Sequence, residues 1–139
     1  MKTKSCILFL FILSAYVFGQ SSNMKEFASH LKKQVKNDGY SIIHDNYHDI
    51  NSYRPMSSNT ITFSSKKQYS IVVLVEKRTS VNIKLNIDGE EIEPKCYYDS
   101  KLNISVVMTS FKDVSGKGYI EASINDQLWH TGYFLIGVK

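Results

Sequence analysis

The densest group of side chains that could do chemistry lies in one six-residue segment, His44-Asp45-Asn46-Tyr47-His48-Asp49. Imidazoles and carboxylates are the donors of zinc and copper sites, and a carboxylate often orients a ring nitrogen. The candidate metal ligands are therefore His44, Asp45, His48 and Asp49. In an extended strand, however, residues four apart lie ~13 Å from each other, beyond the reach of one ion. We expect an ordinary polar loop with no bound cofactor and keep a metal site as the alternative.

Other residues with catalytic potential have simpler structural interpretations. Cys96 shares a strand face with Ile92, which predicts a buried, inert thiol. The glycine-rich run 115–118 leads into a strand, whereas a phosphate-binding loop opens a helix, so we interpret it as a turn. Glu91 and Glu93 share one side of a strand and are interpreted as solvated charges. We therefore expect no enzymatic activity.

Aromatic side chains are the better candidates for ligand contact. Tyrosine and tryptophan suit both sugar rings and the energetic centres of protein interfaces. Four of them fall in expected loops or on outward-facing strand positions and are the candidate contact residues: Tyr47, Tyr53, Tyr97 and Trp129.

The amino terminus has the three parts of a secretory signal. Lys2 and Lys4 precede the apolar stretch 6–18, and Val17 and Gly19 occupy the positions that signal peptidase reads. The apolar stretch is shorter than the ~20 residues of a membrane-spanning helix. We expect residues 1–19 to be a cleaved signal peptide and the mature protein to be secreted or periplasmic, without a membrane anchor.

Residues 20–139 are expected to form a single domain, which is long enough to bury a core without disulfides. The chain has 17 Lys and Arg residues against 13 Asp and Glu residues, and the signal removes Lys2 and Lys4. The remaining excess of two positive charges gives no electrostatic reason to expect binding to nucleic acid or to an anionic membrane.

The elements that must position these side chains are one helix and a series of strands. Met24, Phe27, Ala28, Leu31 and Val35 recur at helical spacing, which predicts an amphipathic helix over about 24–37. From residue 40 the period changes to two, and Asp88-Gly89 predicts a type I′ hairpin turn. The continuous apolar run 71–75 predicts a central strand covered on both faces. Further strands are expected at 40–43, 60–64, 81–87, from 91, and at 102–108, 120–124 and 134–138.

This pattern predicts a mainly β fold. It is an antiparallel, jelly-roll-like sandwich of two sheets with seven or eight short strands and the helix at its edge or end. The segment 44–59 is expected to be the longest irregular connection, and long loops are often functional.

Parts of the chain resemble a known family. The segments 61–63 and 69–75, the strand 81–87, Gly118-Tyr119-Ile120 and Gly132-Tyr133-Phe134 are similar to bacterial pre-peptidase C-terminal domains and to GOLD-type sandwiches. The resemblance covers roughly residues 57–139. It implies a non-catalytic sandwich that binds or targets, although this chain lacks the clustered acidic residues with which some of those domains hold calcium.

The leading hypothesis is an exported, non-catalytic binding module whose partner is an unknown protein or carbohydrate. A small metal-binding protein using residues 44–49 is one alternative. A secreted inhibitor or toxin-like protein is the other, and the size of the chain is compatible with it.

Overall fold

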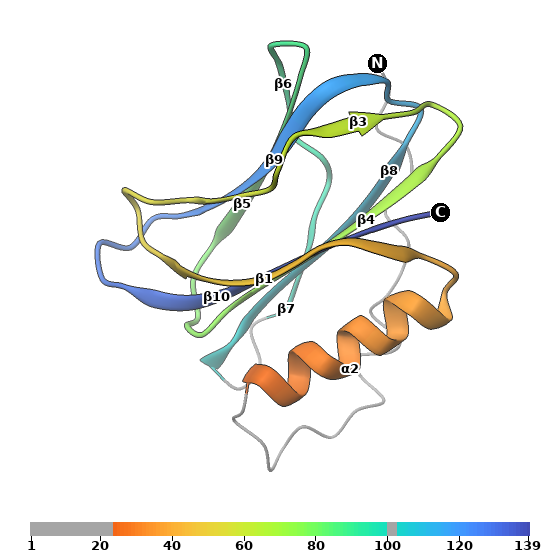
Figure 1. Cartoon of the computed structure of the whole chain (residues 1–139). Coiled ribbons are helices and arrows are strands. Elements are labelled where there is room, and N and C mark those ends of the chain that lie inside the picture. Colours follow the sequence, from red (N-terminus) through yellow and green to blue (C-terminus); the bar gives the residue numbers. More distant parts are fainter. Residues whose placement is uncertain (1–23, 100–102) are drawn as a thin grey trace.

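The computed structural model describes residues 24–99 and 103–139. The expected signal peptide, residues 1–19, lies outside these residues. One helix and two antiparallel sheets form three layers, with the helix on the outer face of the first sheet (Figure 1). No helix within the described residues is long and apolar enough to cross a membrane.

The first sheet has five strands in the order β1-β10-β4-β8-β7. Their bounds are β1 Ser41–Ile50, β10 His130–Val138, β4 Gln68–Val75, β8 Ser105–Lys112 and β7 Tyr97–Asp99. The second sheet has the order β2-β9-β5-β6, and β3 also pairs with β9. Its strands are β2 Met56–Ser57, β9 Gly116–Ile124, β5 Val81–Ile87, β6 Glu90–Ile92 and β3 Ile61–Phe63. The expected antiparallel two-sheet sandwich is thus confirmed.

The described residues contain ten strands, where seven or eight were expected. The difference comes from two short strands that were not expected separately, β2 with two residues and β7 with three. The run 115–118, expected to be a turn, is also partly strand, since β9 begins at Gly116. Its neighbours β3 and β5 hold it in the sheet from both sides.

Two apolar cores flank the first sheet. The inner core fills the space between the sheets and includes Ile71, Val73 and Val75 of β4. On the opposite face, Val72 and Leu74 pack against the helix α2, Met24–Asn37. The expected helix is confirmed, as is the expected double coverage of residues 71–75. The helix buries the five residues that its spacing indicated: Met24, Phe27, Ala28, Leu31 and Val35.

The turn between β5 and β6 has the expected backbone. Asp88 and Gly89 both have positive φ, at 52° and 83°, as a type I′ turn requires. The Asp88 side chain also accepts a hydrogen bond from the backbone N of Lys117, at 3.1 Å. The hairpin is therefore tied to the beginning of β9.

The first strand corrects one prediction. Residues 44–50 were expected to be part of an irregular loop, but β1 continues to Ile50 and pairs with β10 residue by residue from His44 to Ile50. Because β1 is an edge strand, much of its surface meets solvent and its sequence is polar. Only the segment from Asn51 to Pro55 then separates β1 from β2.

Cys96 also differs from its prediction. Its thiol packs against the inner core but is only partly buried, and Sγ donates a hydrogen bond to the Pro94 carbonyl at 3.3 Å. The residue precedes β7 rather than lying in the middle of a strand, which explains why the alternation argument overestimated its burial.

Candidate functional site

Two loops meet at the end of the sandwich where β1 ends and β10 begins. These end loops are residues 51–54 and 125–129. The backbone N of Ser52 donates to the Asp126 carbonyl at 2.6 Å, and the Arg54 guanidinium lies 6.0 Å from the centroid of the Trp129 ring. Segments more than seventy positions apart in the sequence thus form one surface.

The first end loop is a tight turn organised by Asn51. Its side-chain Oδ1 accepts hydrogen bonds from the backbone N atoms of Tyr53 and Arg54, both at 3.0 Å. The backbones of Asn51 and Arg54 also form an isolated β-bridge. An asparagine that bonds to the backbone two and three residues ahead restricts the turn to one conformation. The backbone that carries Tyr53 is therefore held by this turn.

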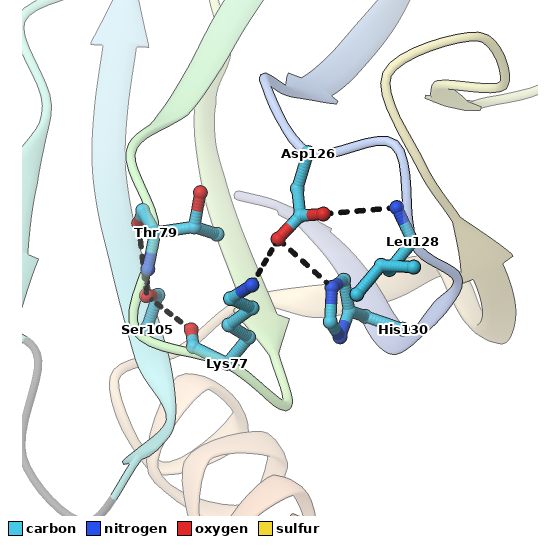
Figure 2. Close-up of polar contacts among 6 residues, drawn as sticks. All are labelled: Lys77, Thr79, Ser105, Asp126, Leu128 and His130. Carbon is cyan, nitrogen blue, oxygen red and sulfur yellow. Dashed lines mark hydrogen bonds and ion pairs between the residues drawn. The ribbon is translucent and has the colours of Figure 1, made fainter.

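The second end loop is organised by Asp126 (Figure 2). Its carboxylate accepts a hydrogen bond from the backbone N of Leu128 at 2.9 Å, forms an ion pair with Lys77, and lies 3.1 Å from Nε2 of His130. The hydrogen bond from Lys77, followed by that from Leu128, lowers the pKa of Asp126 to about 2. The carboxylate is thus ionised under all ordinary conditions.

Lys77 is itself held in place through its backbone. The hydroxyl of Ser105 lies 2.6 Å from the Lys77 carbonyl and 2.9 Å from the Thr79 carbonyl, and accepts a hydrogen bond from Thr79 N at 2.8 Å (Figure 2). The segment after β4 is therefore fixed to β8. Because Asp126 forms an ion pair with Lys77, the second end loop is connected to this segment and to β8 as well.

The end loops carry the most exposed large apolar side chains of the described residues. The exposed fractions are 73% for Tyr53, 67% for Leu128 and 55% for Trp129. We call Tyr53, Arg54, Leu128 and Trp129 the contact patch. Burial of such side chains against a partner is favourable, at roughly 25 cal/mol per Å² of apolar surface. Because hydrogen bonds already restrict both loops, binding would order little additional backbone.

Replacing Asp126 by alanine is expected to loosen the second end loop, because Leu128 N and Lys77 then lose their common partner. Trp129 is the only tryptophan, so its fluorescence anisotropy reports on this loop directly. The anisotropy should fall in Asp126→Ala and stay at the wild-type value in Asp49→Ala, which removes an exposed carboxylate from β1. Equal anisotropy in all three proteins would show that Asp126 does not hold the loop.

The four aromatic residues predicted to contact a ligand lie in different parts of the structure. Tyr53 and Trp129 lie together in the contact patch. Tyr47 is exposed on β1, but on the helix side of the sheet, where its ring lies 4.8 Å from that of Tyr133. It also lines a small pocket of about 210 Å³ with Met24, Lys25, Glu76 and Thr131. Tyr97 belongs to β7, and its side chain lies outside the described residues.

Two members of the contact patch, Arg54 and Leu128, were not predicted. Leu128 gives a weak signal, because it adjoins Trp129 after the polar residues Asn125 and Asp126, where a strand has already ended. Arg54 gives no signal in the sequence, since it belongs to the contact patch only because its guanidinium lies over the Trp129 ring.

The four candidate metal ligands do not lie together as one group. His44 and His48 lie on the inner face of β1, whereas Asp45 lies on the helix side and Asp49 is exposed. Asp45 forms an ion pair with Lys32 and accepts a hydrogen bond from the Tyr133 hydroxyl at 2.6 Å. Burial opposes ionisation of Asp45, but the bonds from Lys32 and Tyr133 outweigh it and lower its pKa. Within the described residues, no three His, Cys, Asp or Glu side chains are placed to hold one ion.

Comparison with known proteins found no match. No family model matches the chain, and no curated protein or solved structure matches it either. The resemblance to pre-peptidase C-terminal and GOLD-type domains therefore stays a prediction.

Proposed function

We propose that the chain is an exported, non-catalytic binding module and that the contact patch meets its ligand. The observation that carries the proposal is the combination of exposure and order. Tyr53, Leu128 and Trp129 are all more than half exposed, yet they belong to loops that are hydrogen-bonded to each other and to the sandwich. Contiguous exposed apolar patches mark interaction sites, whereas apolar residues scattered singly over a surface are ordinary.

The composition of the patch fits a protein or carbohydrate ligand. Tyrosine, tryptophan and arginine are the residue types that contribute most to binding energy in protein interfaces. Aromatic rings also stack on the apolar faces of sugars. The Arg54 guanidinium lies 6.0 Å from the centroid of the exposed Trp129 ring, a distance at which a cation is attracted to the ring face.

Tryptophan fluorescence offers a direct test, because Trp129 is the sole tryptophan and lies in the patch. A panel of immobilised oligosaccharides and extracellular proteins is screened for binding, and each binder is then titrated in solution. We expect the ligand to shift the Trp129 emission to shorter wavelength as the ring leaves water. Tyr53→Ala should weaken binding at least tenfold, which corresponds to about 1.4 kcal/mol.

Tyr119→Ala is the matched control. Tyr119 is another exposed tyrosine, with 39% of its surface accessible, but it lies on β9 of the second sheet. The control should bind like the wild type. A ligand whose affinity is unchanged in Tyr53→Ala and in Trp129→Ala would contradict the proposed site.

A further inference from the structure

His44 and His48 lie much closer together than strand spacing suggests. Their rings are nearly parallel, with an interplanar angle of 11° and a centroid separation of 5.9 Å. Residues four apart in a strand have backbones ~13 Å apart, so the two rings must lean toward each other. Asn46, which lies between them in sequence, is exposed. The distance argument against a shared ligand therefore does not apply to the side chains.

Both rings leave a nitrogen buried and unused. Nε2 of His44 and Nε2 of His48 are inaccessible to solvent and have no hydrogen-bond partner. His44 is only 8% exposed as a residue, and Phe134 contacts its ring edge-on at a centroid distance of 5.0 Å. A buried polar atom without a partner lowers the stability of the fold, because it has lost its hydrogen bonds to water and gained none in exchange. Two such atoms on adjacent rings require an explanation beyond packing.

A thioether lies near His48. His48 is directly opposite Gly132 in the pairing of β1 with β10, and residues so paired point to the same face. Gly132 has no side chain, and Met56 fills the space above it. A Cβ placed on Gly132 would lie 2.6 Å from Sδ of Met56. Sδ is therefore located over the immediate cross-strand neighbour of His48, within the same inner face.

The donor atoms on this inner face of β1 determine which metal ions it can bind. The donor atoms that this face offers are the imidazole nitrogens of His44 and His48 and the thioether sulfur of Met56. Asp45 belongs to the helix side of β1 and accepts its hydrogen bonds there. Hard divalent ions such as Mg²⁺ and Ca²⁺ prefer oxygen ligands, whereas imidazole and thioether donors suit soft copper(I).

We propose that His44 and His48, with Met56 beside them, form a binding site for a soft monovalent metal ion, namely copper(I), for which silver(I) is the stable substitute. The stacked rings turn their Nε2 atoms toward the ion when it binds, and the Met56 sulfur completes the donor set. This site is separate from the contact patch and depends on different residues, so the two proposals stand or fall independently.

The test measures thermal unfolding of the full chain by circular dichroism with one or more equivalents of silver(I) in chloride-free buffer. Cys6→Ser and Cys96→Ser are present in every protein, because thiols bind the same ion. We expect silver(I) at a hundredfold excess over its Kd to raise the Tm by roughly 5–10 °C. Copper(I), kept reduced by ascorbate and competed against a coloured chelator, should bind with one ion per chain.

Variants identify the ligands. His44→Leu with His48→Leu should abolish the shift, and its Tm without metal should equal or exceed that of the parent, because two unsatisfied nitrogens are gone. Met56→Leu conserves volume and should weaken silver(I) binding about tenfold. His30→Gln on α2 is the control and should respond like the parent. No shift in the parent, or the same shift in the double leucine variant, would overturn the site; full affinity in Met56→Leu would overturn the role of the sulfur.

Discussion

Phe111→Ala is expected to destabilise the domain by about 3–5 kcal/mol, the usual range for removal of a buried aromatic ring. Phe111 is fully buried on β8 and stacks against Tyr69, with ring centroids 5.2 Å apart. Phe63 contacts both rings, at 5.9 Å from Phe111 and 5.0 Å from Tyr69. Alanine would leave a cavity where strands of both sheets meet. Urea unfolding followed by far-ultraviolet circular dichroism measures the loss.

The neighbouring residues limit how far this cavity can collapse. The Tyr69 hydroxyl accepts a hydrogen bond from Ser64 N at 2.8 Å, so its ring cannot move into the space without breaking that bond. Phe111→Leu fills part of the volume and should cost clearly less than the alanine variant. Tyr119→Ala, at an exposed position, should change the stability by less than about 0.5 kcal/mol. A loss below 1 kcal/mol in Phe111→Ala would mean that the cluster repacks freely.

Gly118→Ala is expected to be nearly as damaging, at about 3 kcal/mol, the upper end of the range for overpacking. Gly118 lies in β9 between β3 and β5, opposite Ile87. A Cβ on Gly118 would lie 1.8 Å from the carbonyl oxygen of Asn86 and 2.9 Å from Cα of Ile87. These are backbone atoms of a paired strand, so the clash is relieved only by separating β9 from β5.

Gly89→Ala is the informative control for this substitution. Gly89 is in the β5–β6 turn with φ of 83°, but a Cβ there meets no atom within 4 Å. Alanine at this position is strained only by its backbone angle and should cost about 1–2 kcal/mol. If the urea midpoints of Gly118→Ala and Gly89→Ala coincide, the close approach of β9 to Asn86 does not restrict residue 118.

Predictions from sequence succeed where one face of an element is buried and the other is solvated. The helix α2 and the strand β5 both satisfy this condition. The alternating residues Val81, Ile83, Leu85 and Ile87 are buried, while Asn82 is exposed. For β8 the alternation is misleading, because this interior strand is buried on both faces from Ser105 to Phe111.

Predictions fail for β1, and the reason is its place at the edge of the sheet. His44 and Ile50 are buried, but Asn46, Tyr47 and Asp49 are exposed, so neither face gives a clear hydrophobic pattern. The polar composition of β1 then resembles that of a loop. Only the pairing with β10 identifies the segment as a strand, and the partner lies near the other end of the sequence.

The two candidate sites show the same limit. Tyr53 and Trp129 are recognisable as exposed aromatics, but their proximity follows from the hydrogen bond between Ser52 and Asp126. Likewise, His44 and His48 are an obvious pair in the sequence, whereas the position of Met56 depends on the absence of a side chain at Gly132. Contacts that depend on a third residue cannot be inferred from spacing.

The pairing of β1 with β10 also determines when the domain can fold. Within the described residues, β10 is the only strand that pairs with β1, and it likewise joins β4 into the first sheet. A chain emerging from the ribosome therefore carries an unpaired first strand until residues 130–138 are available. Such long-range pairing raises the contact order, which slows folding and favours a late, cooperative closure of the first sheet. Fragments that end before His130 cannot complete the first sheet, and residues 41–50 in them are exposed to association with other molecules.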